Sequence, residues 1–326
     1  MIAAMLDEAL AAFERRLAER VGEHPACSLL REALDYHFGL GAFGPVRRGK
    51  RLRPQMLFRF AFQLGARIEC ALDAAAAIEI LHNYSLVHDD IEDRDELRHG
   101  RPTLWARYGV AQAINAGDAM CAISFLALAE SERELGPARG LAAVRELHEA
   151  HREMCNGQAL DLAFESRAAV TFDEYLEMIA GKTSALFGAA SALGAICAEA
   201  DVAAVERARR FGREYGMAFQ IRDDILGIWG DESLTGKRIA GDIARRKWSF
   251  PIVWALAQPA CVARETVASM YASGRSLERN EVEAVRNALD ELAARTACEH
   301  AIAQRLDTLQ RFGDNDLYRF AADSLG

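Results

Sequence analysis

The sequence is poor in the features that build β-sheets or cross-linked folds. It has only 7 prolines in 326 residues. We find no alternating Val/Ile/Thr runs bounded by Asn-Gly or Asp-Gly turns, so strand signals are nearly absent. Its 7 cysteines are odd in number and scattered, and no CxxC pair occurs, so neither a zinc site nor a disulfide framework is indicated. Reduced thiols are the simple interpretation, and they predict a cytoplasmic protein.

The chain also lacks an excess of positive charge and a long uncharged run. A net charge of −9 argues against nucleic-acid binding, and it means that an anionic ligand needs a local basic cluster. The longest charge-free stretch, residues 183–198, is shorter than the roughly 20 residues of a membrane-spanning helix. We therefore expect no stable membrane insertion, and the Ala, Gly and Ser of this stretch predict a closely packed buried helix.

Helical periodicity, in contrast, is found almost everywhere. Leu6, Phe13 and Leu17 recur at the spacing that places apolar side chains on one helix face. Thr171, with Glu174 three residues later, has the pattern of a capping box at a helix start. Apolar residues make up 51% of the chain, enough for a sizeable core. We predict one all-α domain over residues 1–326 with ten or more helices.

The stretch "HDDIEDRDELRHGRPT", residues 88–103, follows an apolar helical run. Asp89 and Asp93 are four residues apart and would share a helix face, with Asp90 beside them. Carboxylates this close repel one another unless a cation joins them. Mg²⁺ prefers oxygen ligands and often shares its shell with substrate phosphates, and the arginines that follow could clamp those phosphates. A solvated acidic face is the alternative.

A second Asp-Asp pair lies far away in the sequence. Asp223 and Asp224 also end an apolar run, and Lys237 and Lys247 follow them. Two helices could face each other across a cavity, each with carboxylates at its rim. The basic run "RRGKRLRP", residues 47–54, suggests an anion pocket without metal in an otherwise acidic protein.

These segments together resemble the trans-polyprenyl diphosphate synthases, such as geranylgeranyl and farnesyl diphosphate synthases. The resemblance covers about residues 50–250 in family order. The matching segments are "GKRLRP" at 49–54, "LHNYSLVHDDIEDRDELRHGRPT" at 81–103, "NAGD" at 115–118, "GQALDL" at 157–162, "GKTSALF" at 181–187, "FQIRDDIL" at 219–226, and "TGK" with "GDIARRK" at 235–247.

The resemblance implies helices around a central apolar cavity, a homodimer, and Mg²⁺-dependent condensation of isopentenyl diphosphate with an allylic diphosphate. It implies that Asp89, Asp93 and Asp223 bind Mg²⁺, with Asp90 and Asp224 close behind. It assigns the allylic diphosphate to Arg98, Lys182 and Lys237, and isopentenyl diphosphate to Lys50, Arg53, His82 and, less strongly, His99. It places Thr183, Gln220 and Lys247 at the reaction centre.

Two positions depart from the family pattern. His99 stands where a second arginine is usual, and a neutral imidazole would weaken a contact with isopentenyl diphosphate. Gly227 stands where the second motif usually has its third aspartate, although Asp223 is still present and Asp231 lies two turns beyond it.

Three alternatives remain at this point. A class I terpene cyclase shares the fold but normally carries a different second motif. A His-Asp phosphohydrolase needs an upstream ligand for which His37 is the only candidate outside the helix. A regulatory subunit of a heteromeric synthase would explain His99, but such subunits usually lose the first aspartates.

Product length depends on residues before the first motif. Ser85 and Tyr84 lie four and five positions before Asp89, about one turn away along a helix. In the family, bulk at these positions acts as a floor for the growing chain. A large Tyr84 with no insertion in the motif resembles enzymes that make C20, with C15 as the alternative.

Overall fold

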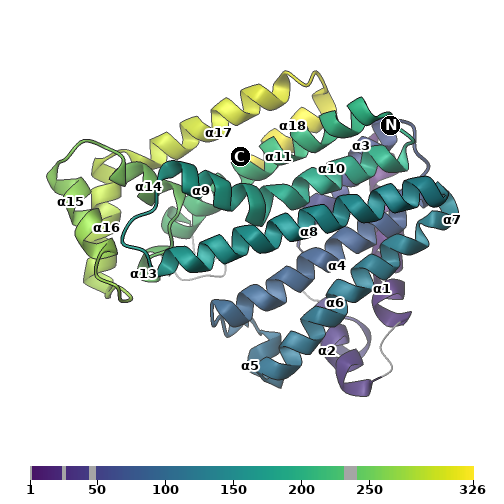
Figure 1. Cartoon of the computed structure of the whole chain (residues 1–326), viewed down its shortest axis with the longest axis horizontal. Helices are drawn as coiled ribbons and strands as arrows, with labels where there is room; N and C mark the ends of the chain where they lie inside the picture. Colours follow the sequence, from purple (N-terminus) through teal and green to yellow (C-terminus); the bar gives the residue numbers. More distant parts are fainter. Residues whose placement is uncertain (1, 24–26, 44–48, 231–240) are drawn as a thin grey trace. The chain divides into compact units, whose positions relative to one another are not determined.

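The computed structural model describes residues 2–23, 27–43, 49–230 and 241–326, and within them the fold is almost entirely helical (Figure 1). The predicted all-α class with ten or more helices is confirmed. The described residues also contain a short antiparallel hairpin, in which Leu97 pairs with Pro102 and Arg98 with Arg101. Position 99 follows β1 directly, and its turn conformation rather than any alternation in the sequence makes this pairing possible.

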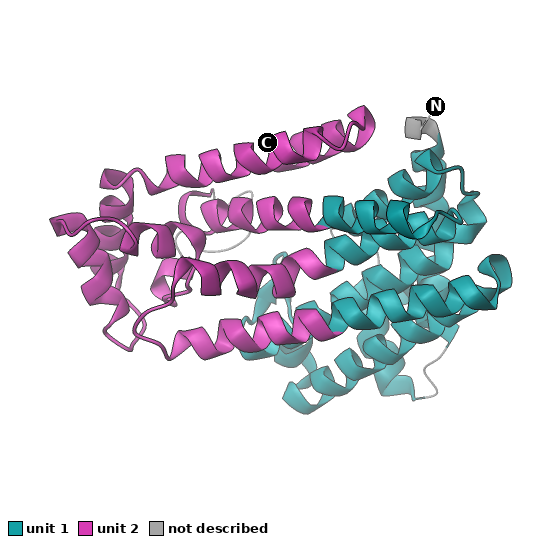
Figure 2. Ribbon diagram, turned by 45° about the horizontal axis from the view of Figure 1, so that its top comes forward, with its two compact units in different colours: residues 1–151, 186–212 teal, residues 152–185, 213–326 magenta. Residues whose placement is uncertain are grey.

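The described residues form two compact units (Figure 2). Unit 1 comprises residues 1–151 and 186–212, and unit 2 comprises residues 152–185 and 213–326. Helices α8 (Pro137–Glu165), α10 (Ala185–Cys197) and α11 (Val202–Trp229) contribute residues to both. That residues 1–326 act as a single domain stays a prediction.

Unit 1 is built around a long helix whose middle part is buried on every side. It contains α1 (Ile2–Glu23), α2 (Ser28–Phe38), the 3₁₀ turn η1 (Gly41–Phe43), α3 (Leu52–Gln63), α4 (Ile68–Glu92), β1 (Leu97–Arg98), β2 (Arg101–Pro102), α5 (Leu104–Tyr108), α6 (Val110–Glu130) and α7 (Glu132–Leu135). Helix α4 packs against α1, α3 and α6, and its run from Ala74 to Leu81 is completely covered apart from Glu79. A helix without a polar face belongs in a core, so the polar end of α4 is the part that can meet a ligand.

Buried carboxylates in α4 are paired with arginines from other helices. Arg16 and Arg20 of α1 approach Asp73 to 2.7 and 2.9 Å, and Arg51 approaches Glu79 to 2.6 Å. Breaking a buried pair of this kind leaves an uncompensated charge. These pairs therefore fix α4 relative to α1 and α3 within unit 1.

The remaining elements of the fold lie in unit 2. Its elements are α9 (Phe172–Ile179), the π-helical turn η2 (Ala180–Ser184), α13 (Gly241–Ala244), α14 (Phe250–Leu256), α15 (Val262–Tyr271), α16 (Arg279–Glu291), α17 (Ala294–Gln310) and α18 (Asn315–Leu325). The predicted capping box at the start of α9 is confirmed: the Glu174 N–H donates to Thr171 Oγ1, and the Thr171 N–H donates to Glu174 Oε2 at 2.8 Å. The cap determines where α9 begins and which face carries Tyr175 inward.

Two helical stretches are long and apolar enough to cross a membrane by length and composition alone: Val110–Leu135 and Phe172–Cys197. Of the second, 83% is buried inside the protein, which confirms the predicted buried helix around residues 183–198. The first is 39% buried, and Ile114 and Leu126 on its outer face are exposed. This composition test is weak evidence for a membrane span, so the absence of membrane insertion stays a prediction.

Candidate active site

Asp89 and Asp93 lie together where α4 ends. The Asp93 N–H donates to the Asp89 carbonyl at 2.8 Å, so the two residues are one helical turn apart, and both side chains are half-buried. The carbonyl end of a helix carries partial negative charge and disfavours carboxylates. Two carboxylates at this end form a strongly negative spot that suits a bound cation.

Asp90 has a different role from its neighbours. It is 3% exposed, and its Oδ1 accepts from Arg98 Nε at 2.9 Å and from Arg98 Nη2 at 2.7 Å. Burial raises the pKa of Asp90, and the Arg98 guanidinium opposes that shift. Asp90 is therefore engaged with Arg98 and holds it in place.

The hairpin β1–β2 carries Arg98 to this position. Its turn places His99 at φ 52° and Gly100 at φ 77°, and His99 is exposed at the tip. Both central residues of such a tight turn need positive φ, which Gly adopts freely and His tolerates. On the next strand, Tyr36 Oη donates to the Pro102 carbonyl at 2.8 Å and anchors the hairpin to α2.

Several residues assigned to the predicted anion pocket lie near His82 in unit 1. Burial lowers the pKa of His82 well below its usual value, and the charges of Arg53, Arg98 and Arg51 lower it further. Three sequence segments, around residues 51–53, 82 and 98, are therefore close enough to interact electrostatically. The half-buried His82 therefore lies among cations, where an anion would be stabilised.

The two described arginines of the basic run, Arg51 and Arg53, have different surroundings. Arg53 lies over the Phe187 ring at 4.3 Å, so its guanidinium plane is oriented by stacking. Arg51 is committed to Glu14 at 2.9 Å and to Glu79 at 2.6 Å, so it is a packing residue. Lys50 is exposed directly beside it. Arg47 and Arg48 lie outside the described residues.

In unit 2, as at Asp89 and Asp90, one aspartate of the pair is accessible and the next is buried. Asp223 of α11 is exposed, whereas Asp224 is 7% exposed. Asp224 accepts from Tyr175 Oη at 2.6 Å, from the Phe250 N–H at 2.7 Å and from Gln220 Nε2 at 3.0 Å. Burial raises the pKa of Asp224 to about 7, and the three donors oppose that shift. Asp224 joins α9, α11 and α14, and leaves Asp223 as the accessible carboxylate.

Lys182 and Thr183 lie in the π turn η2, pressed against α8. A Cβ on Gly157 would lie 2.0 Å from the Lys182 nitrogen, so only glycine permits this contact. Lys182 Nζ is 2.5 Å from Asp161 Oδ2, and Thr183 Oγ1 donates to Gln220 Oε1 at 2.6 Å. Because Gln220 also donates to Asp224, one hydrogen-bond chain runs from the π turn to the buried aspartate.

The space beside Gly227, in the second motif, is filled by a side chain that the sequence did not indicate. A Cβ on Gly227 would lie 2.0 Å from Asp242 Oδ2, so the Asp242 carboxylate occupies the space of a side chain at position 227. Asp242 also raises the pKa of Asp224 through its charge, and is thus near it. Asp242 of α13 thus brings a carboxylate next to the position that lacks one. Sequence reasoning missed this residue, although it lies inside the quoted segment "GDIARRK".

Of the two lysines predicted after the second aspartate pair, only Lys247 lies within the described residues. Lys247 follows α13, and its backbone is fixed because its N–H donates to the Asp242 carbonyl at 2.8 Å and its carbonyl accepts from Tyr271 Oη at 3.2 Å. Lys237 and Asp231 lie outside the described residues.

The donor set fits Mg²⁺ that is completed by a substrate. Within residues 2–23, 27–43, 49–230 and 241–326, no group of three or more His, Cys, Asp or Glu side chains is arranged to hold a metal ion. Mg²⁺ is usually held by one or two carboxylates together with waters and substrate phosphates. Asp89 with Asp93 is such a pair, and a basic group that can hold phosphate lies in the same unit.

A model of the polyprenyl synthetase family matches residues 29–291. The chain belongs to this family. It is a prenyl diphosphate synthase, hence a prenyltransferase of isoprenoid biosynthesis, and its family uses divalent metal ions. The predicted family and enzyme class are confirmed, which excludes the phosphohydrolase alternative.

The synthase has relatives of both expected product classes. It is 37% identical to a (2E,6E)-farnesyl diphosphate synthase of Mycobacterium tuberculosis, over 93% of this chain and 84% of the relative. It is 39% identical to a geranylgeranyl diphosphate synthase of the same species, over 80% of this chain and 75% of the relative. Both names denote short-chain synthases, so the short-chain class is supported and the C15 or C20 product is left open.

Solved structures agree with the family. A polyprenyl synthetase of Streptomyces coelicolor A3(2) has a TM-score of 0.87 and 32% identity, and covers 100% of this chain and 99% of its own. A polyprenyl synthase of Caulobacter crescentus, solved with calcium and isoprenyl diphosphate, has a TM-score of 0.85 and 28% identity over 99% of this chain and 94% of its own. That relative combines a divalent cation and a diphosphate in one structure.

The contact between Gly227 and Asp242 gives a testable prediction. Gly227→Ala should keep the synthase folded, since alanine favours a helix by roughly 0.5–1 kcal/mol over glycine, but its methyl group must push the Asp242 carboxylate aside. We expect Gly227→Ala and Asp242→Asn to raise the Mg²⁺ concentration for half-maximal turnover by a similar factor. A titration of turnover with Mg²⁺ measures this, with Asp307→Asn on the exposed face of α17 as control. An unchanged Mg²⁺ requirement in both variants would remove Asp242 from the site.

Proposed function

We propose that this synthase couples isopentenyl diphosphate to an allylic diphosphate in a Mg²⁺-dependent 1'-4 condensation, and that its main product is C20 geranylgeranyl diphosphate. The observation that carries the chain length is the packing of Tyr84. Its ring lies 4.7 Å from the His88 ring and 5.2 Å, edge to face, from the His151 ring of α8. A large side chain supported by two further rings is a firm stop one turn before Asp89.

The proposed reaction breaks the C–O bond of the allylic diphosphate and forms a C–C bond to the double bond of isopentenyl diphosphate. Mg²⁺, when bound by Asp89, Asp93 and Asp223, supplies positive charge to the leaving diphosphate. The chain's own cations support the same charge: Arg98 is preorganised by Asp90, and Lys182 can exchange its Asp161 partner for a phosphate oxygen. Lys237 is proposed beside them from the sequence alone.

The second substrate is assigned to the cluster around His82. Arg53 and Lys50 would bind its diphosphate, with His82 as a hydrogen-bond donor and His99 at the edge. Thr183, Gln220 and Lys247 would line the reaction centre. The proton lost from isopentenyl diphosphate goes to the departing pyrophosphate. Water must be kept from the allylic cation, and the apolar residues of α4 beneath the aspartates suit that task.

Product analysis tests the proposal. The purified chain is incubated with Mg²⁺, isopentenyl diphosphate and each allylic primer in turn, and the dephosphorylated products are separated by chromatography. We expect mainly C20 from the wild type and longer products from Tyr84→Ala. Ser85→Ala is the matched control, because it changes a small neighbour whose hydroxyl only donates to the His82 carbonyl at 2.8 Å.

Each outcome has a defined meaning. A C15 product from the wild type would replace C20, and a product of C30 or longer would overturn the short-chain assignment. An unchanged distribution in Tyr84→Ala would remove Tyr84 as the floor. No condensation with any primer would favour the regulatory subunit, and a cyclised hydrocarbon would favour the terpene cyclase.

His99 gives a separate prediction about the second substrate. His99→Arg should lower the KM for isopentenyl diphosphate several-fold and leave the allylic KM unchanged, because a permanent cation is added near one diphosphate only. The backbone permits the change, since Arg51, Arg94 and Arg246 already adopt positive φ in this chain. His99→Gln, without charge, is the control. If His99→Arg abolished turnover instead, the imidazole would have a role of its own.

We further propose a homodimer in the cytoplasm, with residues 1–326 of each copy as one synthase domain. Exposed large apolar side chains on α6 and α8 support self-association: Ile114 is 41% exposed, Leu126 50% and Leu141 55%. Covering them with a second copy of the chain would remove apolar surface from water. Light scattering after size exclusion tests the state, with Leu126→Glu expected to yield monomers.

A further inference from the structure

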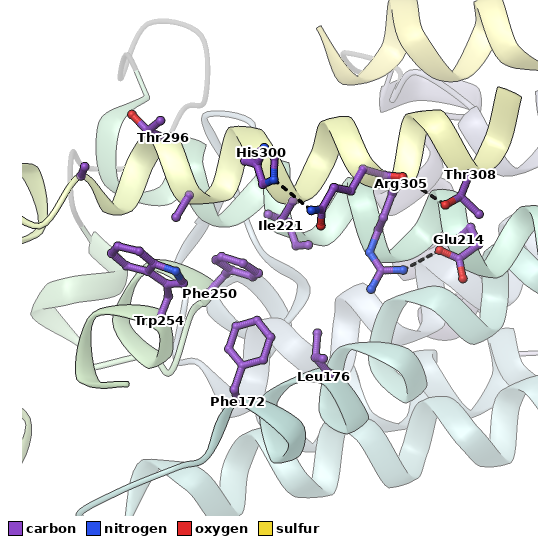
Figure 3. A pocket seen from close by; sticks show the side chains of 14 residues that line it. Phe172, Leu176, Glu214, Ile221, Phe250, Trp254, Thr296, His300, Arg305 and Thr308 are labelled. Carbon is purple, nitrogen blue, oxygen red and sulfur yellow. Dashed lines mark hydrogen bonds and ion pairs between the residues drawn. The ribbon is translucent and has the colours of Figure 1, made fainter. Parts of the chain in front are cut away.

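Unit 2 contains a pocket that neither aspartate pair uses (Figure 3). Its volume is about 820 Å³, within the roughly 300–1,000 Å³ of small-molecule sites. It lies between α17 and the helices α9, α11 and α14, and all of its lining residues belong to unit 2. Asp223, Lys182 and Gln220 are absent from the lining, so the pocket is distinct from the proposed reaction centre.

One side of the pocket is apolar and rich in aromatic rings. Phe172 of α9 and Phe250 of α14 meet edge to face at 5.2 Å, and Trp254 lies one turn beyond Phe250. Leu176 and Ile221 complete this wall. Figure 3 shows the three aromatic side chains facing α17. Such a wall can hold an elongated hydrocarbon but offers its body no hydrogen bonds.

The opposite side, on α17, is polar but electrically balanced. Arg305 Nη1 pairs with Glu214 Oε2 at 2.5 Å, so its charge is already neutralised. Gln304 Nε2 and His300 Nε2 are 2.9 Å apart, and Thr296 and Thr308 add hydroxyl groups. Of the described residues that line the pocket, Arg305 is the only one with a permanent positive charge. A diphosphate needs several cations, so this wall suits an uncharged polar head.

We propose that this pocket binds an uncharged amphiphile: a long isoprenoid-like hydrocarbon ending in a hydroxyl group. The hydrocarbon lies along Phe172, Phe250 and Trp254, and the hydroxyl exchanges hydrogen bonds with His300, Gln304 or a threonine of α17. The pocket thus discriminates against the diphosphates that the synthase proposed above would turn over. This choice of probe rests on the proposed function, but the presence of a site for an uncharged amphiphile does not.

Calorimetric titration with the C15 alcohol farnesol tests the site. Ala301→Trp places a large ring inside the pocket and should weaken farnesol binding at least tenfold. Ala303→Trp makes the same change on the same helix at an exposed position outside the lining, and should alter binding less than twofold. Farnesoic acid, which has the same chain but a carboxylate head, should bind the wild type at least tenfold more weakly than farnesol.

A second measurement does not depend on the filled variant folding. Farnesol should change the tryptophan fluorescence of the wild type, and Trp254→Phe should remove that change. Equal farnesol affinity in Ala301→Trp and the wild type, or an unaltered fluorescence response in Trp254→Phe, would overturn the site. Farnesoic acid binding as tightly as farnesol would overturn the uncharged head. Failure of the proposed function would instead appear as absent condensation in the product assay, with farnesol binding unaffected.

Discussion

Asp89→Ala and Asp223→Ala are each expected to lower turnover by about two to four orders of magnitude, a loss in the range found when one preorganised electrostatic contact is removed from a reaction centre. Each change deletes an accessible carboxylate that is proposed to bind Mg²⁺. Asp89 is half-buried at the end of α4, and Asp223 is exposed on α11. Neither removes core packing, so we expect the melting temperature to change little.

Steady-state kinetics at saturating Mg²⁺ and thermal unfolding of the same samples check this expectation. Asp307→Ala, an exposed carboxylate on α17, is the matched control and should retain full turnover. Asp89→Glu keeps the charge and should recover part of the lost rate. Near-normal turnover in either alanine variant would defeat the metal assignment of that residue.

Asp224→Ala should instead unfold unit 2, although it neighbours Asp223 in the sequence. The substitution leaves three donors without their acceptor: the Tyr175 hydroxyl, the Phe250 N–H and the Gln220 amide. Tyr175 is fully buried, so water cannot replace the carboxylate there. At roughly 1–3 kcal/mol for each of these three unsatisfied groups, the loss in unfolding free energy is about 3–9 kcal/mol.

Chemical denaturation tests this expectation by ranking the unfolding free energies of several variants. We expect Asp224→Ala to lose the most stability, Asp224→Asn less because one amide oxygen still accepts, and Tyr175→Phe least because it removes one donor cleanly. Asp223→Ala on the same helix is the control and should unfold like the wild type. If Asp224→Ala were stable and inactive, Asp224 would be a chemical participant and its hydrogen bonds would be secondary.

The two Asp-Asp pairs illustrate what the sequence could and could not specify. The local sequence pattern predicts where the aspartate pairs lie, that each follows a helical run, and which family they resemble. The structure confirms the first helix through Glu92 and the predicted capping box at Thr171. The family resemblance placed Asp90 and Asp224 behind the aspartates assigned to the metal, but the local pattern alone did not say that these second members are the buried ones. Neighbouring residues on a helix point about 100° apart, so a helix packed on one side can expose only one of the two.

That difference had a readable signal. Asp224 lies three residues after the buried Ile221 and four before the buried Ile228, on the apolar face of α11. Asp90 likewise lies three after Val87. Gly227 had no such signal, because its cause is a side chain from α13, fifteen positions away, that only the folded chain brings near. In the folded chain, the Asp242 carboxylate occupies the space that a side chain at position 227 would need.

The π turn at Ala180–Ser184 makes the length of this segment a fixed quantity. A π turn holds about one residue more than an α turn, so the extra residue is accommodated within the turn and the helices on either side keep their phase. Removing one residue would restore a regular α turn and leave the flanking helices in place, but it would turn the side chains inside the turn by about 100°. Lys182 and Thr183 lie in that turn, and Gly157 leaves their backbone no room to shift. A one-residue deletion here should therefore displace Lys182 and Thr183 while α10 beyond them stays buried as before.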